Sequence, residues 1–214
     1  MADFPAAAAR ASLVFARLAP LWPDARPLLS HGDCFQLLVA VILSAQCTDE
    51  QVNAVTPGLF AAYPGPRELA SADPVRVRDI IHSTGFYLTK ARNIVATARI
   101  IEERYSGRVP GTIEELVELP GVGRKTANLV VSACFGTPGI IVDTHVLRAA
   151  RRLGIAPTDD PARSERMIAD AVPREHWTAF SYAINRHGKH VCRARKPDCG
   201  ACPVRDLCPS AGMA

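Results

Sequence analysis

Four cysteines near the end of the chain have a spacing suited to binding metal. Their pattern is Cys192-x6-Cys199-x2-Cys202-x5-Cys208. Four thiolates in one short segment can hold a zinc ion or a cubane iron–sulfur cluster. Zinc sites usually have two close cysteine pairs, whereas only Cys199 and Cys202 form such a pair here. The longer gaps favour a 4Fe–4S cluster, with zinc and four free thiols as the alternatives.

Three further cysteines, Cys34, Cys47 and Cys134, are scattered through apolar stretches. We expect all three to pack as small hydrophobic side chains. In a reducing compartment, the crowding of the other four favours metal binding over disulfide bonds.

A glycine-rich turn with basic residues has the composition of a backbone-binding element. The segment reads Leu119-Pro-Gly-Val-Gly-Arg-Lys-Thr-Ala-Asn128, in which Gly121 and Gly123 permit a tight bend and close approach to a ligand. The free N–H groups of the helix that follows suit a phosphate. The spacing does not fit a P-loop, which disfavours a nucleoside triphosphate site. The pattern is that of a helix-hairpin-helix, which grips the DNA backbone without reading bases.

Lys125, at the end of this turn, is a candidate nucleophile. It is one of four lysines among 25 Lys and Arg residues, and lysine can lose its proton and attack, whereas arginine in practice cannot. Arg124 and the start of the helix would both disfavour the charged form of the amine. Most lysines in proteins are simply exposed to solvent, so the assignment of Lys125 as a nucleophile depends on the neighbouring motifs.

A carboxylate stands where another helix is expected to begin, in Val142-Asp-Thr-His145. Asp143 has the position of an N-cap. Beside a cleft, the same carboxylate can also stabilise positive charge that develops on a sugar. His145 is assigned no chemistry.

Helix start and stop signals dominate the chain and predict an all-α protein of about ten helices. Only residues 139–142 are strand-like. The expected helices are 35–45 after Asp33, one after Thr48 with Gln51, one from Asp73-Pro74 to Gly85, 87–105 closed by Gly107, one from Thr112 to Leu119, 125–135, one from Asp143 to Leu153, one after Asp160-Pro161, and 174–190.

The composition limits the classes of protein to which the chain can belong. The 214 residues, 48% of them hydrophobic, suffice for one large domain or two small ones. A net charge of +4 and a pI near 8.8 are compatible with a polyanionic partner. The apolar run 35–45 is too short to cross a bilayer, and Arg10 and Arg17 interrupt the N-terminal segment where a secretory signal needs an unbroken apolar core. We therefore expect a cytoplasmic protein.

Taken together, these motifs resemble the endonuclease III family of DNA glycosylases, over residues 27–208. The resemblance is carried by Leu43-Ser-Ala-Gln-Cys-Thr-Asp49, by the glycine turn, by Val142-Asp-Thr-His145 and by the cysteine spacing. It implies two all-helical domains that flank a DNA-binding cleft. One is a six-helix barrel of residues 27–137 that contains the hairpin, and the other joins residues 1–26 to 138–214 and holds the cluster.

The resemblance also implies a reaction and a substrate class. Lys125 would attack the anomeric carbon of the damaged nucleotide, while Asp143 would assist departure of the base and activate the lysine. A Schiff base would form, and β-elimination would nick the strand. The expected partner is duplex DNA with damaged pyrimidines or abasic sites, bound by a monomer associated with the nucleoid.

Several residues are expected to contact DNA. A base must leave the duplex before its sugar can be attacked, and the resemblance assigns Gln46 and a later wedge residue to filling the gap. The wedge position holds Phe86 where the family usually has leucine, and Cys47 stands where alanine is common. The basic loop around the cysteines, with Lys196, balances the thiolate charge or contacts phosphate. The other expected backbone contacts are Gly121, Gly123 and Arg124.

Three other functions fit part of the pattern. Monofunctional adenine glycosylases of the same superfamily lack the nucleophilic lysine and usually carry a further C-terminal domain, whereas this sequence has Lys125 and ends six residues after Cys208. Thymine-mismatch glycosylases of the same fold also usually lack the lysine. A non-catalytic DNA-binding or electron-carrier protein would explain the cysteines, but it would need neither Lys125 nor Asp143.

Overall fold

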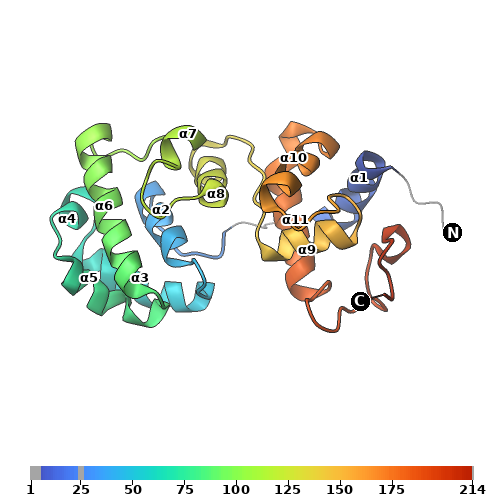
Figure 1. Cartoon of the computed structure of the whole chain (residues 1–214), viewed down its shortest axis with the longest axis horizontal. Coiled ribbons are helices and arrows are strands. Elements are labelled where there is room, and N and C mark those ends of the chain that lie inside the picture. Colours follow the sequence, from blue (N-terminus) through green and yellow to red (C-terminus); the bar gives the residue numbers. More distant parts are fainter. Residues whose placement is uncertain (1–5, 24–26, 214) are drawn as a thin grey trace. The chain divides into compact units, whose positions relative to one another are not determined.

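The structure, a computed structural model, describes residues 6–23 and 27–213. In these ranges it contains eleven α-helices, four short 3-10 helices and no strand, which confirms the predicted all-α class (Figure 1). No helix in the described ranges is long and apolar enough to span a bilayer. The described residues divide into two compact units, one made of Pro27–Thr137 and the other of the described parts of Met1–Arg26 and Pro138–Ala214.

The Pro27–Thr137 unit is built around one apolar helix. Helix α2 (Cys34–Leu43) buries eight of its ten residues. A helix that is apolar on most sides must be covered on most sides, and α2 packs against α3, α6 and α8. The elements around it are α3 (Asp49–Ala62), α4 (Pro66–Ala70), α5 (Pro74–Ile81), the 3-10 helix η2 (His82–Thr84), α6 (Tyr87–Tyr105), α7 (Ile113–Leu116) and α8 (Arg124–Phe135).

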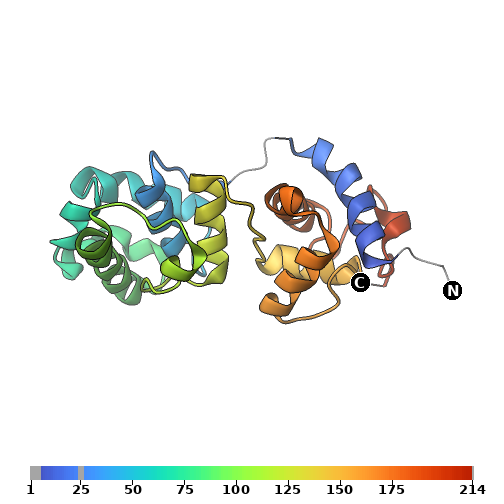
Figure 2. The same ribbon diagram turned by 90° about the horizontal axis from the view of Figure 1, so that it is seen from above.

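The other unit joins the start of the chain to its end. Helix α1 (Ala7–Leu18) packs against α10 and α11 (Figure 2). Arg10 is 8% exposed, and its Nη1 donates to the carbonyls of Leu153 at 3.0 Å and Gly154 at 3.1 Å. This buried guanidinium ties α1 to the end of α9. The remaining elements are η1 (Ala19–Leu21), α9 (Thr144–Arg152), α10 (Pro161–Ala171), η3 (Arg174–His176), α11 (Trp177–His190) and η4 (Arg205–Leu207).

Most helix boundaries follow the capping signals in the sequence. Helix α6 begins and ends at the predicted residues. The helix after Thr112 is shorter than predicted, because α7 ends at Leu116 and a turn follows in which the Leu119 N–H donates to the Leu116 carbonyl. The predicted N-caps whose side chains accept a hydrogen bond from the first helical turn are Asp33, Thr48, Asp73, Thr112, Asp143 and Asp160.

Residues 139–142, predicted to be strand-like, belong to no strand in the described chain. The backbone N–H of Gly139 donates to Thr178 Oγ1 at 3.1 Å, and that of Ile141 donates to Ser181 Oγ at 3.0 Å. Side chains of α11 therefore satisfy backbone groups that a strand would pair with a second strand. The strand prediction is wrong because an apolar run does not reveal which partner its backbone will find.

Two of the three cysteines predicted to be free form a disulfide. Cys34, the first residue of α2, is bonded to Cys134, near the end of α8, with the two Cα atoms 5.7 Å apart. The prediction is wrong for this pair because the packing of α2 against α8, which brings the two together, leaves no local signal. Cys47 is free and half-buried.

Reduction of the Cys34–Cys134 bond is expected to destabilise the Pro27–Thr137 unit. The bond spans a sequence separation of 100, and by chain entropy such a cross-link contributes about 4–5 kcal/mol to the free energy of unfolding. Denaturant unfolding with and without a thiol reductant measures the difference. The Cys34→Ser/Cys134→Ser double variant should be equally unstable in both conditions, so an undiminished reductant effect in that variant would contradict the assignment.

Candidate functional site

The glycine-rich segment forms the turn between α7 and α8. Gly121 has a φ of 80°, a conformation that glycine adopts without steric cost. A Cβ on Gly121 would lie 2.8 Å from Asn93 Nδ2, so a side chain there would have to displace Asn93. Thr97 Oγ1 donates to the Pro120 carbonyl at 3.0 Å, which anchors the turn on α6. Gly123 is the N-cap of α8 and supplies no capping side chain to its first turn.

Lys125 is the second residue of α8 and is exposed, as is Arg124 before it. Residues 127–131 of the same helix are buried, and α8 packs against the apolar helix α2. The lysine is therefore carried by a well-packed helix, at a position that a bound molecule can reach.

One carboxylate oxygen of Asp143 caps α9, and the other oxygen accepts a further hydrogen bond. Its Oδ1 accepts from the backbone N–H of His145 at 3.0 Å and of Val146 at 2.8 Å. Its Oδ2 accepts from Asn185 Nδ2 at 2.6 Å. Three donors thus bind the carboxylate and fix its orientation.

Asn185 belongs to a polar stripe on α11 that the sequence reasoning missed. Thr178, Ser181 and Asn185 lie three and four residues apart, so they share one face of the helix. Their side chains bind alternate residues of the extended segment, at positions 139, 141 and 143. The helical spacing of these small polar residues was the available signal. The stripe fixes the segment that ends at Asp143.

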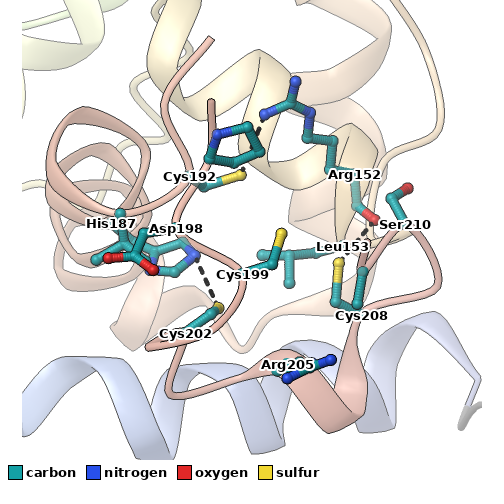
Figure 3. A pocket seen from close by; sticks show the side chains of 13 residues that line it. Arg152, Leu153, His187, Cys192, Asp198, Cys199, Cys202, Arg205, Cys208 and Ser210 are labelled. Carbon is teal, nitrogen blue, oxygen red and sulfur yellow. Dashed lines mark hydrogen bonds between the residues drawn. The ribbon is translucent and has the colours of Figure 1, made fainter. Parts of the chain in front are cut away.

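The four predicted metal-binding cysteines line one pocket (Figure 3). Arg152 Nη1 lies 3.7 Å from Cys192 Sγ, and Cys208 Sγ lies 3.4 Å from the Arg152 carbonyl. His187 Nε2 lies 3.9 Å from Cys202 Sγ. The thiols come from the segment after α11, whereas α9 and α11 supply these polar groups around them.

The lining of the pocket suits a group that neutralises thiolates. Four thiols line it together. Burial raises the pKa of Cys202 and Cys208, and the neighbouring thiols raise it further. Such thiols are unfavourable as anions unless cations neutralise them, which the irons of a cluster would do.

A basic loop follows Cys192. Arg193, Arg195 and Lys196 are exposed, and Lys196 has a φ of 53°. The backbone of the loop is held from α9, because the Arg152 guanidinium donates to the carbonyls of residue 193 at 2.7 Å and residue 194 at 3.2 Å. The loop therefore presents its cations on a fixed backbone, an arrangement that suits phosphate contacts.

Gln46 and Phe86 lie on two short loops of the Pro27–Thr137 unit, between α2 and α3 and between η2 and α6. Both are exposed and both have positive φ, 52° and 47°, which is uncommon for residues with large side chains. Gln51 Nε2, in the first turn of α3, donates to Ser83 Oγ of η2 at 2.7 Å. This hydrogen bond links the elements that flank the two loops.

The predicted site residues thus fall into separate groups. The four cysteines share one pocket, and Gln46 and Phe86 lie on linked loops. Gly121 and Gly123 lie in the hairpin turn, and Arg124 and Lys125 directly after it begin α8. Lys125 belongs to the Pro27–Thr137 unit, and Asp143 and Lys196 belong to the other.

Two family profiles match the chain. One, described as HhH-GPD superfamily base excision DNA repair protein, matches residues 39–174. The other, described as the iron–sulfur binding domain of endonuclease III, matches residues 192–208. Endonuclease III of Synechocystis sp. is 49% identical over 203 residues, which cover 94% of this chain and 93% of that relative. Endonuclease III of Escherichia coli K12 is 39% identical over 195 residues, which cover 91% and 92%.

Solved structures are similar over the same length. A trapped covalent intermediate of endonuclease III with DNA aligns with a TM-score of 0.92 at 38% identity, covering 100% of this chain and 99% of that one. A thermostable thymine-DNA glycosylase aligns with a TM-score of 0.85 at 22% identity, covering 96% and 98%. At 22% identity the second similarity concerns the fold alone.

The purified protein is expected to be brown and to contain about four irons per chain. Cys199→Ser should lose the iron and the visible absorption, because the pocket then lacks one thiolate ligand. Cys47→Ser is the matched control and should keep both, since Cys47 lies outside the pocket. Elemental analysis and absorption spectra measure the outcome, and a colourless protein that contains zinc would contradict the cluster.

Proposed function

The chain belongs to the endonuclease III family of HhH-GPD base excision DNA repair proteins, and we propose on this basis that it is a bifunctional DNA glycosylase and AP lyase. It removes oxidised pyrimidines from duplex DNA and nicks the strand at the abasic site. The observation that carries the proposal is the similarity to endonuclease III along nearly the whole chain. We further propose that it acts as a monomer on the nucleoid in the cytoplasm.

Lys125 is the nucleophile of the proposed reaction. Its amine loses a proton and attacks C1′ of a nucleotide that has left the base stack. The bond from C1′ to the damaged base breaks, and the base leaves with the electron pair and takes up a proton. Opening of the sugar ring turns the new C–N bond into a Schiff base, and loss of a proton from C2′ then expels the 3′ phosphate. The exposure of Lys125 at the start of α8 supports this role.

Asp143 is the proposed carboxylate of the reaction. Positive charge develops on the sugar as the base leaves, and a pre-oriented carboxylate stabilises it. The same group accepts the proton that the Lys125 amine must lose. The hydrogen bonds from His145, Val146 and Asn185 support a role that needs a charge of fixed orientation.

Further residues are proposed to bind the DNA. Gln46 and Phe86 fill the space that the extruded nucleotide leaves, and the Phe86 ring, larger than a leucine side chain, stacks on the neighbouring bases. Lys196 contacts phosphate from the basic loop. The hairpin contacts phosphate through Gly121, Gly123 and Arg124.

The segment Cys192 to Cys208 binds a 4Fe–4S cluster. Its four thiolates are Cys192, Cys199, Cys202 and Cys208. When bound, the cluster neutralises these thiolates and cross-links the segment. The chain's own Arg152 holds the loop backbone beside it, so the proposed phosphate contact at Lys196 stays in place.

Lys125→Gln is expected to abolish borohydride trapping of the protein on a duplex that contains thymine glycol. Glutamine has no amine that can form the Schiff base that borohydride reduces. Lys189→Gln is the matched control, because Lys189 lies on α11 and has no assigned role. Gel electrophoresis of the covalent complex measures trapping, and trapping that persists in Lys125→Gln would reject the nucleophile.

Asp143→Asn and Asp143→Ala should separate the capping role of this residue from its chemical role. Asparagine can still cap α9, so Asp143→Asn should keep the stability and lower the single-turnover rate of base release by about 10²–10⁴. Asp143→Ala should lose the same activity and also about 1 kcal/mol of stability. A rate in Asp143→Asn equal to that of the unsubstituted protein would show that the carboxylate is only a cap.

A further inference from the structure

Lys90 is a buried lysine that binds the loop carrying Phe86. Only 4% of Lys90 is exposed, and lysine is almost never fully buried without a partner. Its Nζ donates to the Thr84 carbonyl at 2.6 Å, and its backbone N–H donates to the Phe86 carbonyl at 3.0 Å. One residue of α6 therefore holds both ends of the segment from Thr84 to Phe86.

The segment that Lys90 holds has a costly backbone conformation. Gly85 has a φ of 66° and Phe86 a φ of 47°, and no side chain caps α6 at this end. The left-handed region is unfavourable for a residue with a Cβ and persists only where surrounding contacts impose it. Phe86 is 65% exposed, so its ring contributes little packing of its own. The backbone contacts of Phe86 must therefore maintain this conformation.

The anchor for the Lys90 ammonium is itself buried. Thr84 is 1% exposed, and its Oγ1 donates to the Ile81 carbonyl at 2.8 Å. A buried ammonium requires a hydrogen-bond acceptor, and the Thr84 carbonyl at the end of η2 supplies one. A compact ammonium needs less space there than a planar guanidinium.

The second loop is linked to the same region of the unit. Burial lowers the pKa of Lys90, and the charge of Cys47 acts against this effect. Cys47 directly follows Gln46, which also has a positive φ. The hydrogen bond from Gln51 to Ser83 links the flanking elements independently. Both Lys90 and the first turn of α3, the helix after the Gln46 loop, are thus hydrogen-bonded to η2.

We propose that Lys90 is a positioning residue, whose buried ammonium holds the backbone from Thr84 to Phe86 so that the Phe86 ring is presented to the DNA duplex. Lys90 acts through Phe86, because its own side chain is buried. The inference rests on the proposed function, since it requires Phe86 to fill the gap left by an extruded nucleotide.

A double-mutant cycle tests this inference. Lys90→Met keeps an extended side chain and removes the ammonium. The probe is a duplex that contains tetrahydrofuran, an uncleavable abasic analogue, opposite 2-aminopurine, whose fluorescence rises when it unstacks.

We expect Lys90→Met and Phe86→Ala each to weaken binding about tenfold and to reduce the fluorescence rise. The double variant should lose no more binding affinity than either single variant, because both substitutions remove the same contact of the Phe86 ring with the duplex. Lys189→Met should behave like the unsubstituted protein.

Two results for Lys90→Met would overturn the inference. One is unchanged binding and fluorescence, and the other is a loss that adds to that of Phe86→Ala, as expected for a general structural role. If Phe86→Ala has no effect while the unsubstituted protein still releases damaged bases, the wedge assignment fails and this inference fails with it. If the unsubstituted protein releases no base, the proposed function itself is wrong.

Gly85→Ala keeps the test decisive should Lys90→Met fail to fold. Gly85 is exposed, and a Cβ there would meet nothing within 4 Å, so the substitution strains only the positive φ. We expect it to weaken binding and to show the same lack of additivity with Phe86→Ala. Unchanged binding in Gly85→Ala would overturn the inference, because the conformation of this loop would then not matter.

Discussion

The segments that carry the proposed functional residues depend on polar side chains from neighbouring helices. A helix satisfies most of its own backbone groups, whereas a turn or an extended segment must find partners elsewhere. Here those partners are the α11 stripe for residues 139–143, Thr97 for the hairpin turn, Arg152 for the basic loop, and Lys90 for the Phe86 loop. The helices that position these segments are therefore mostly not the helices that carry the reactive groups.

Cysteines clamp each of the two units in a different way. In the Pro27–Thr137 unit, the disulfide joins the start of α2 to the end of α8, the helix that begins beside Lys125. In the other unit, the four thiols of the segment after α11 line one pocket, and Arg152 from α9 and His187 from α11 lie against them. In each unit the cysteines thus contact the helix at whose start a proposed reactive residue lies, α8 for Lys125 and α9 for Asp143.

The sequence predicted what is determined within a few residues. Caps such as Thr48 and Asp160, and both ends of α6, follow from local hydrogen bonding and were predicted correctly. The disulfide and the partners of residues 139–143 depend on contacts between residues far apart in the chain, and the helical spacing of the polar residues on α11 does not name the segment they bind. Lys90 binds residues close to it in sequence, but its burial depends on how α6 packs. The cysteine spacing was informative because all four ligands lie in one short segment.

At position 86, the backbone conformation favours one kind of residue and the proposed DNA contact favours another. Glycine, and to a lesser degree asparagine, adopts a φ of 47° more readily than phenylalanine does. Either replacement would relieve conformational strain while discarding the aromatic ring. Under the proposed wedge role, a protein with either replacement would gain stability and bind damaged DNA less well. An exposed aromatic residue in an unfavourable backbone conformation is then a compromise between stability and activity.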